Sequence, residues 1–180
     1  MAYLARYSST EVGLRRVLFR RIDRWGRAAA DQYAARDHMA AAKGEVPGVV
    51  ARMVELGLVN DAAFAASRAR GLALSGRSRR AIAARLMAKG IAADQARSVV
   101  PDDAEAEFVS ALILTRKRRV GPFRRVAEGN ARAEGDARTE GDARKELGML
   151  ARAGFPRDVA MRALAMDPEA AEVLIRAARE

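Results

Sequence analysis

The sequence predicts an all-α, elongated protein made of helical modules, and three observations support this fold class. Residues 78–100 have the pattern helix, tight turn, helix, because Ser78 is a good N-cap and Gly90 stands where a helix ends in a left-handed residue. A second copy follows 64 residues later, so that Gly90 recurs as Gly154, which is typical of modular helical arrays. Half of the residues are apolar but only 5% are aromatic, which favours small helix-to-helix contacts over one thick core.

The first part of the chain is predicted to contain three helices. A short helix over 2–7 precedes a second helix capped by Thr10, and a third runs over 46–56. Residues 25–44 lie between the second and third helices and are expected to form an alanine-rich, helical insertion. The residues predicted to face inward are Leu14, Val17, Leu18, Phe19, Val49, Val50, Met53 and Leu56.

The middle and last parts are predicted to be helical as well. Asn60 or Asp61 caps one helix, another opens with acidic residues after Pro101, and a closing helix starts at Pro168. Acidic residues in a first turn suit the helix dipole. The residues expected on the buried faces are Phe64, Ala65, Leu72, Phe108, Val109, Leu112, Ile113, Ala171, Leu174, Ile175 and Ala178.

Residues 128–145 form a low-complexity tract of three tandem hexapeptides, EGNARA, EGDART and EGDARK. Each mixes charge with glycine and carries no large apolar side chain. We expect a solvated extension that is dispensable for folding, because such a segment has nothing to bury. Weak helix is the alternative, since Ala, Arg and Glu favour helix while each Gly costs roughly 1 kcal/mol.

The net charge and the absence of catalytic or nucleotide-binding motifs limit the possible classes of function. The net charge of +10 favours a nucleic acid or an acidic partner, with ordinary solvated faces in an arginine-rich composition as the alternative. The chain has no cysteine, no apolar run long enough to span a bilayer and no signal-peptide pattern, so we expect a cytoplasmic protein without a membrane contact. With one histidine, His38, and no phosphate-binding glycine motif, we predict no catalytic residues, no cofactor and no metal site. The acidic run over 102–107 is interpreted as capping.

Clusters of basic residues are the remaining candidates for function. Guanidinium groups at the start of a helix oppose its dipole, so Arg79 and Arg80 point to an external anion. A further group, Arg15, Arg16, Arg20 and Arg21, lies on the first long helix, where a solvated face explains it equally well. The predicted partner-binding residues are Arg77, Arg79, Arg80, Arg85, Arg116, Lys117, Arg118, Arg119, Arg124 and Arg125.

Three stretches carry short motifs in an order that is specific to one family. They are VARMVELGLVNDAAFAASRARGLALSGRSRRAIAARLMAKGI at 50–91, KRRVGPFR at 117–124 and LARAGFPRDVAMRAL at 150–164. The motifs run L-G-L-x-x-D with Phe three residues on, then R-x-R, S-R-R-x-I, L-x-x-K-G-I and a closing A-G-F. In this order they resemble the RecX family of recombinase regulators. Residues 25–44 and the hexapeptide tract depart from the family's pattern.

The resemblance implies an elongated, curved array of three tandem three-helix repeats. The first repeat spans 1–57 with the insertion over 25–44, and the second spans 58–101. The third spans 102–180, with a low-complexity insertion at about 126–143 and a C-terminal helix.

The resemblance also implies a non-enzymatic regulator that binds the RecA filament on single-stranded DNA and inhibits the recombinase, in DNA repair, recombination and the SOS response. We expect a monomer with at most weak, non-specific binding to bare DNA. A helix-turn-helix DNA-binding regulator is the alternative, since residues 78–100 could place one helix in a major groove. A general helical scaffold is the third candidate.

Overall fold

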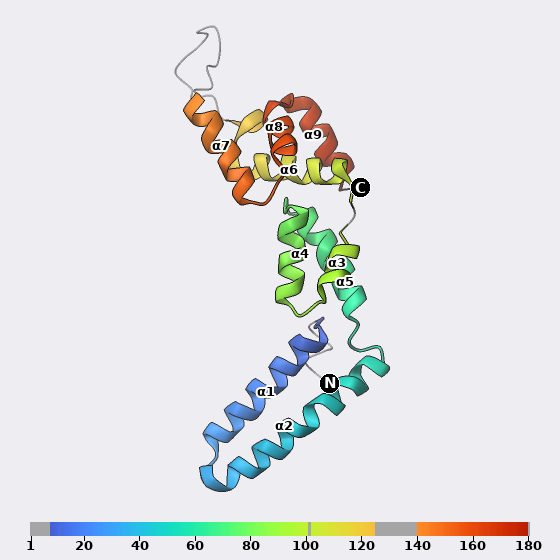
Figure 1. The fold of residues 1–180 in the computed structure, drawn as a ribbon, viewed down its shortest axis with the longest axis vertical. Helices are drawn as coiled ribbons and strands as arrows, with labels where there is room; N and C mark the ends of the chain where they lie inside the picture. Colours follow the sequence, from blue (N-terminus) through green and yellow to red (C-terminus); the bar gives the residue numbers. More distant parts are fainter. Residues whose placement is uncertain (1–7, 101, 125–139, 180) are drawn as a thin grey trace. The chain divides into compact units, whose positions relative to one another are not determined.

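The fold is given by a computed structural model that describes residues 8–100, 102–124 and 140–179 (Figure 1). Within these ranges every regular element is helical, so the predicted all-α class is confirmed. The predicted helix over 2–7 and most of the hexapeptide tract lie outside the described residues. The described elements are α1 (Glu11–Ala28), α2 (Gln32–Glu55), α3 (Asp61–Ala73), α4 (Arg79–Ala88), α5 (Ala93–Ser98), α6 (Ala104–Arg118), the 3-10 helix η1 (Gly121–Phe123), α7 (Glu140–Arg152), α8 (Arg157–Ala165) and α9 (Pro168–Ala177).

The chain divides into two compact units. Unit 1 contains Met1–Ser67 and Leu86–Val99, and unit 2 contains Arg68–Arg85 and Val100–Glu180. The division runs within α3 and α4, so each unit takes part of the predicted second repeat. The repeat boundaries themselves stay a prediction.

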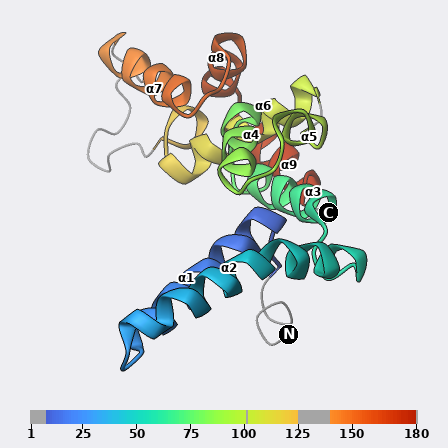
Figure 2. The ribbon, with the colours of Figure 1, turned by 60° about the horizontal axis from the view of Figure 1, so that its bottom comes forward.

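α1 and α2 form an antiparallel hairpin that holds the core of unit 1 (Figures 1 and 2). Thr10 caps α1 as predicted, because its Oγ1 accepts a hydrogen bond from the backbone N of Gly13 at 2.9 Å. One buried cluster of unit 1 consists of Leu14, Val46, Val50 and Val59, with Leu18, Phe19, Ile22 and Met53 packed against them.

α2 is one continuous helix, which the sequence did not predict. The expected insertion over 25–44 supplies the end of α1 and the first half of α2 instead of forming a separate segment. The helix also continues through Pro47, although proline inside a helix removes one backbone hydrogen bond and crowds the preceding turn.

The continuous helix decides which side chains of α2 face inward. Val46, Val50 and Met53 are spaced by four and three residues and share one face, which packs in the core of unit 1. Val49 and Leu56 lie off this face, with exposed fractions of 44% and 48%. The prediction that these two residues face inward is therefore wrong.

The N-cap residues of α1 and α4 make the same long-range hydrogen bond. In unit 1, Thr10 Oγ1 donates to the backbone oxygen of Lys89 at 2.7 Å. In unit 2, Ser78 Oγ donates to the backbone oxygen of Ala153 at 2.6 Å, while it accepts the capping bond from the start of its own helix. Each hydroxyl thus both caps a helix and joins it to a turn more than 70 residues away in the sequence.

Each of these turns contains a glycine in the left-handed region. Gly90 has a φ of 93° and Gly154 a φ of 92°, directly after the two accepting carbonyls. A Cβ at Gly90 would overlap the side chain of Val12, and one at Gly154 would lie 2.7 Å from Ser78 Oγ. Glycine is therefore required twice over, for the backbone conformation and for the close approach of the capped helix. The repeat detected in the sequence corresponds to this repeated junction.

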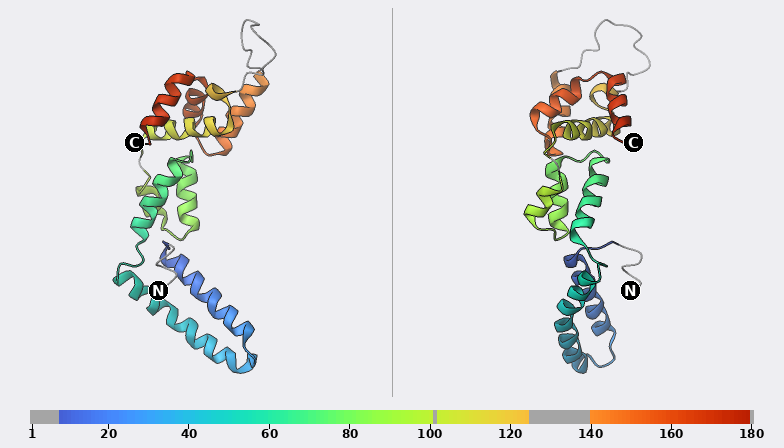
Figure 3. Two further views of the ribbon diagram at one scale, coloured as in Figure 1. Left: turned by 180° about the vertical axis from the view of Figure 1, so that it is seen from behind. Right: turned by 90° about the vertical axis from the view of Figure 1, so that its right-hand side faces the viewer.

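The core of unit 2 is built around α6, with α8 and α9 packed against it (Figure 3). Phe108, Leu112 and Ile113 are buried as predicted, and Leu174 is partly buried beside them. Ala178 is the C-cap of α9 and is exposed, so its predicted inward position is wrong. The buried core residues are Phe108, Ala111, Leu112, Ile113, Leu114, Leu150, Phe155, Val159, Ala160, Ala163, Leu164, Ala171 and Ile175.

The end of the hexapeptide tract is helical. α7 begins at Glu140, so the last hexapeptide lies in its first turns, as the weak-helix alternative predicted. Glu146 and Leu150 form the buried face of α7, and the helix extends back from this anchored part into the tract. Acidic residues at Glu140 and Asp142 suit the helix N-terminus. Residues 140–145 are therefore helical, while Glu140, Arg144 and Lys145 are exposed to solvent, as expected for this tract.

Candidate functional site

Arg79 has its partners inside the chain. Its backbone N donates to Glu107 Oε2 at 2.9 Å, and its guanidinium forms an ion pair with Asp102. The Nε of Arg79 is buried and makes no hydrogen bond to the described residues. The position of Arg79 at the start of a helix therefore does not require an external anion, because the carboxylate of Glu107 already lies at the N-terminus of α4.

Glu107 is an acidic side chain held in the interior. It is only 5% exposed, and burial raises the pKa of its carboxyl above the ordinary value, partly offset by the hydrogen bond from Arg79. A carboxylate at this position stabilises the positive end of α4 and joins it to α6. The start of α4 is thus a structural junction of unit 2.

Arg116 and Arg124 also form internal ion pairs. Arg116 Nη1 lies 2.8 Å from Glu172 Oε2, which links α6 to α9. Arg124 Nη2 lies 2.6 Å from Glu146 Oε1, which links the end of η1 to α7. Both arginines are only partly exposed. Both guanidinium groups therefore join elements of unit 2 through ion pairs. The remaining predicted residue of this region, Arg125, lies outside the described residues.

Four of the predicted residues are brought together at the end of α6. Lys117 Nζ donates to the backbone oxygen of Ser75 at 2.7 Å, and a Cβ at Gly76 would lie 2.9 Å from the backbone N of Leu114. These contacts place the turn before α4 against the last turns of α6. Arg119 ends α6 in the left-handed conformation, with a φ of 55°. The exposed basic residues of this region, called the α6 basic cluster below, are Arg77, Lys117, Arg118 and Arg119.

Arg80 and Arg85 remain exposed on α4. The Cβ of Arg80 lies close to the turn at Gly154, 3.5 Å from where a Cβ on that glycine would stand. Neither residue belongs to the ion pairs described above. The structure thus separates the predicted set into internal pairs, the α6 basic cluster and these two arginines of α4.

The sequence did not predict the contact between Glu105 and Arg162. Two nitrogens of Arg162 donate to the two carboxylate oxygens of Glu105 at 2.7 and 3.0 Å, and the guanidinium lies 3.8 Å from the centre of the Phe108 ring. The hydrogen bonds from Arg162 lower the pKa of Glu105 and raise that of Arg162. The two residues are 57 positions apart, so no local pattern could reveal the pair.

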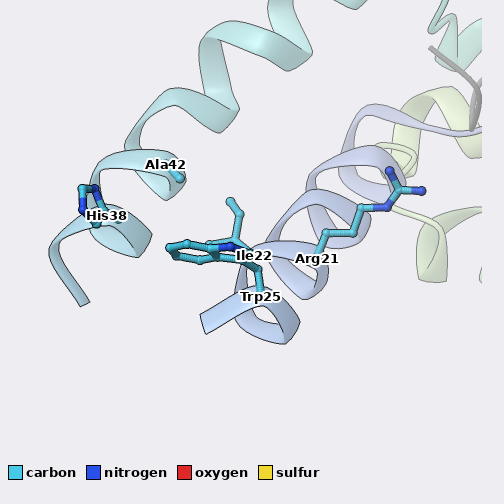
Figure 4. Close-up of a pocket in the computed structure, with 5 residues that line it drawn as sticks. All are labelled: Arg21, Ile22, Trp25, His38 and Ala42. Atoms are coloured by element: carbon cyan, nitrogen blue, oxygen red, sulfur yellow. The ribbon is translucent and has the colours of Figure 1, made fainter. Parts of the chain in front are cut away.

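Two hollows were also not predicted. An open hollow of about 570 Å³ lies between α1 and α2 and is lined by Arg21, Ile22, Trp25, His38 and Ala42, with the indole of Trp25 between the two helices (Figure 4). A groove of about 750 Å³ lies between α7 and α8 and is edged by Arg144 and Arg157. A single tryptophan with arginines on both sides is the sequence signal that could have indicated the first hollow.

No group of three or more metal-ligating side chains comes together within the described ranges. No helix in the described part of the chain is both long and apolar enough to cross a membrane.

Within its described residues the chain is all-helical, with repeated junctions and clusters of exposed basic residues. Residues 60–100 match the family model described as RecX, second three-helix domain. The chain is 36% identical over 175 residues to the Regulatory protein RecX of Myxococcus xanthus (strain DK1622), covering 92% of this chain and 82% of that relative. It is also 32% identical over 117 residues to the Regulatory protein RecX of Agrobacterium fabrum (strain C58 / ATCC 33970), covering 65% of this chain and 57% of that relative. No solved structure matches. The chain belongs to the RecX family of regulatory proteins.

Proposed function

We propose that this chain binds the RecA filament on single-stranded DNA and inhibits the recombinase. The observation that carries the proposal is the membership in the RecX family, which rests on similarity over 92% of the chain. The α6 basic cluster supplies the chemistry, because exposed arginines and lysines attract both phosphates and acidic protein surfaces. We also propose a monomeric protein in the cytoplasm, where a DNA-bound recombinase acts.

In this proposal the chain inhibits the recombinase because it binds one arrangement of the RecA filament more tightly than the others. A regulator that binds one arrangement of an assembly more tightly than another shifts the population toward the preferred arrangement. Arrays of repeats present extended surfaces, so one chain can contact several groups on a filament at once. A filament held in one arrangement exchanges strands and hydrolyses ATP more slowly.

The experiment is a charge reversal of the α6 basic cluster. The triple variant Arg77→Glu, Arg118→Glu and Arg119→Glu should bind RecA filaments about tenfold or more weakly and lose inhibition of ATP hydrolysis, because like charges replace complementary ones. Its helix content, measured by circular dichroism, should stay unchanged, since these side chains are exposed.

The control variant reverses three other exposed arginines, Arg68, Arg70 and Arg97, and changes the net charge equally. Equal loss in both variants would show that overall charge and not the cluster is responsible. Full inhibition by the folded cluster variant would refute the assignment of the site.

Binding should also be compared with bare DNA across a salt titration. Binding to DNA alone depends on phosphate contacts and falls steeply with salt, whereas filament binding includes apolar and hydrogen-bonded protein contacts that salt screens less. We expect filament binding to survive at salt concentrations that abolish binding to bare DNA. Equal slopes, or tight binding to one duplex sequence over scrambled duplexes, would favour the helix-turn-helix alternative.

A further inference from the structure

The groove between α7 and α8 is lined by apolar and small residues and by two arginines. The two helices pack together in unit 2 (Figure 2), and the groove between them has a volume of about 750 Å³. Its lining residues recur every three or four positions along each helix, so each helix contributes one flank. Apart from Arg144 and Arg157, every described residue of the lining is apolar or glycine, including Ala143, Leu147 and Ala151 of α7 and Ala160, Met161 and Leu164 of α8.

Packing within unit 2 does not explain the exposed part of this groove. Ala160 and Leu164 are buried and belong to the core of unit 2. Met161, next to them on α8, is 52% exposed and lies outside that core, and Ala151 and Ala165 are exposed as well. Methionine is flexible and common on surfaces that bind other proteins, and contiguous exposed apolar groups mark such surfaces. The apolar interior of unit 2 thus continues out to solvent along the groove.

The walls of the groove favour a helix as its occupant. Along their length α7 and α8 satisfy their backbone N–H and C=O groups within themselves, so they offer no hydrogen-bond partners to the backbone of an extended peptide. A helix satisfies its own backbone and can place apolar side chains into a groove at every third or fourth residue. Gly148 and Ala151 keep the flank of α7 low, which allows the axes of packed helices to approach closely.

The charge of the groove indicates the sign of that helix. Arg144 and Arg157 are exposed, and neither forms an ion pair with the described residues. Arg157 is the first residue of α8, where a positive charge opposes the helix dipole and no side chain caps the helix. None of the described lining residues is acidic: Glu146 pairs with Arg124, and Asp158 points about 100° away from Arg157 around α8.

We propose that the α7–α8 groove binds an amphipathic helix of an acidic partner protein. Apolar side chains of that helix contact Leu147 and Met161, and carboxylates on its two edges pair with Arg144 and Arg157. A second copy of the chain fits less well, because its net charge of +10 repels the two arginines. Residues 128–139 of the chain carry no large apolar side chain that could fill the groove. The inference does not rest on the proposed function, since it uses neither the α6 basic cluster nor the family membership.

The first test is the selection of peptides from a phage-displayed library with the full chain as bait. Each peptide has 13 residues, the length of α7, with leucine or alanine at every third or fourth position and a free choice of glutamate, glutamine or lysine elsewhere. Selected peptides should carry glutamate on both sides of the apolar stripe and should gain helical circular dichroism on binding. Proline at the centre of a selected peptide should abolish binding, because it breaks the helix. Binding that survives the proline would overturn the choice of a helix.

Charge reversal then tests whether the selected peptides bind in the groove. Arg144→Glu combined with Arg157→Glu should weaken binding of a glutamate peptide about tenfold and should favour its lysine version, because attraction is replaced by repulsion. The matched control, Arg68→Glu combined with Arg70→Glu, reverses two exposed arginines of α3 and should leave the affinity nearly unchanged. Equal losses in the two double variants would show a response to net charge alone and would refute the site.

A change in Met161 tests the apolar flank without a change of charge. Met161→Gln keeps the length of the side chain and should weaken peptide binding about tenfold, because the partner no longer buries an apolar group there. Met87→Gln changes a methionine of α4 that is 44% exposed, and should leave binding unchanged. Circular dichroism checks that both variants fold. Full affinity of the folded Met161→Gln protein would contradict the proposed contact.

Two further measurements distinguish the acidic helix from other occupants. A dimer of the chain that sedimentation detects and that Met161→Gln dissociates would assign the groove to a second copy. Displacement of the peptide by monomeric dodecanoate would assign it to a small anionic amphiphile. Either result would overturn the proposal. No recombinase is present in these tests, so their failure leaves the proposed filament binding open, and failure of filament binding leaves the groove open.

Discussion

Ser78 makes two hydrogen bonds through one buried hydroxyl, and its replacement tests how much the repeated junction contributes to stability. Ser78 is fully buried, caps α4 through the backbone N of Ala81 at 3.2 Å and donates to the backbone oxygen of Ala153 at 2.6 Å. Ser78→Ala removes both bonds without adding volume. Loss of an N-cap costs about 1 kcal/mol, and loss of a second intramolecular hydrogen bond costs about 1 kcal/mol more.

We therefore expect Ser78→Ala to lower the free energy of unfolding by about 2 kcal/mol. In a chain of this size that corresponds to a fall of roughly 4–8 °C in the melting temperature. The assay is urea and thermal unfolding followed by circular dichroism. Ser78→Gly separates the contribution of the N-cap from that of the hydrogen bond to Ala153. Glycine at an N-cap costs only a few tenths of a kcal/mol, so most of the destabilisation of this variant comes from the lost hydrogen bond to Ala153.

Two further variants complete the test. Thr10→Ala removes the equivalent pair of bonds in unit 1 and should destabilise by a similar amount. Ser98→Ala removes an exposed hydroxyl that bonds only to Gln95 in its own helix, and should change stability by less than about 0.5 kcal/mol. The reasoning would be refuted if Ser78→Ala were as stable as Ser98→Ala. It would also be refuted if Ser78→Gly were as stable as the natural protein, because glycine cannot make the hydrogen bond to Ala153.

Two predictions concern charged groups of α6. Burial raises the pKa of Glu107, so the folded state holds its proton more tightly, and the stability linked to this group is present below its unfolded pKa and lost as the pH rises through the folded one. Glu107→Gln keeps an oxygen that can accept from Arg79, so in urea unfolding its stability relative to the natural protein should increase as the pH rises above about 4.3, the ordinary pKa of glutamate. A difference that stays constant with pH would contradict this. Arg162→Ala removes the hydrogen bonds that lower the pKa of Glu105, so that pKa should rise toward its ordinary value in an NMR titration, and an unmoved titration would show that Arg162 is not the cause.

Local signals in the sequence determined the helices and the repeat. The N-caps Thr10 and Ser78 and the turn glycines Gly90 and Gly154 act on neighbouring backbone groups, so residue type and spacing are enough to predict them. The spacing of apolar residues likewise predicted most of the buried face of α6. The same order of motifs predicted the RecX family, which the comparison with relatives confirms.

Tertiary structure alone decided how the basic residues are used. The predicted set looked uniform in the sequence, yet Arg79, Arg116 and Arg124 are paired with carboxylates on other elements, while Arg118 and Arg119 are exposed. These partners lie between 22 and 56 positions away, and an ion pair depends on distance in space rather than along the chain.

The α1–α2 hairpin is a second feature that the sequence alone could not predict. Helix propensity predicted that residues 25–44 are helical, but it could not show that they belong to two long helices packed side by side. That packing depends on the contact of Gly26 with Met39, and it determines that Val49 faces solvent and that Trp25 lines a hollow. The sequence by itself determines which residues form helices, whereas the packing of those helices determines which side chains remain available to a partner, because availability depends on what covers each side chain in space.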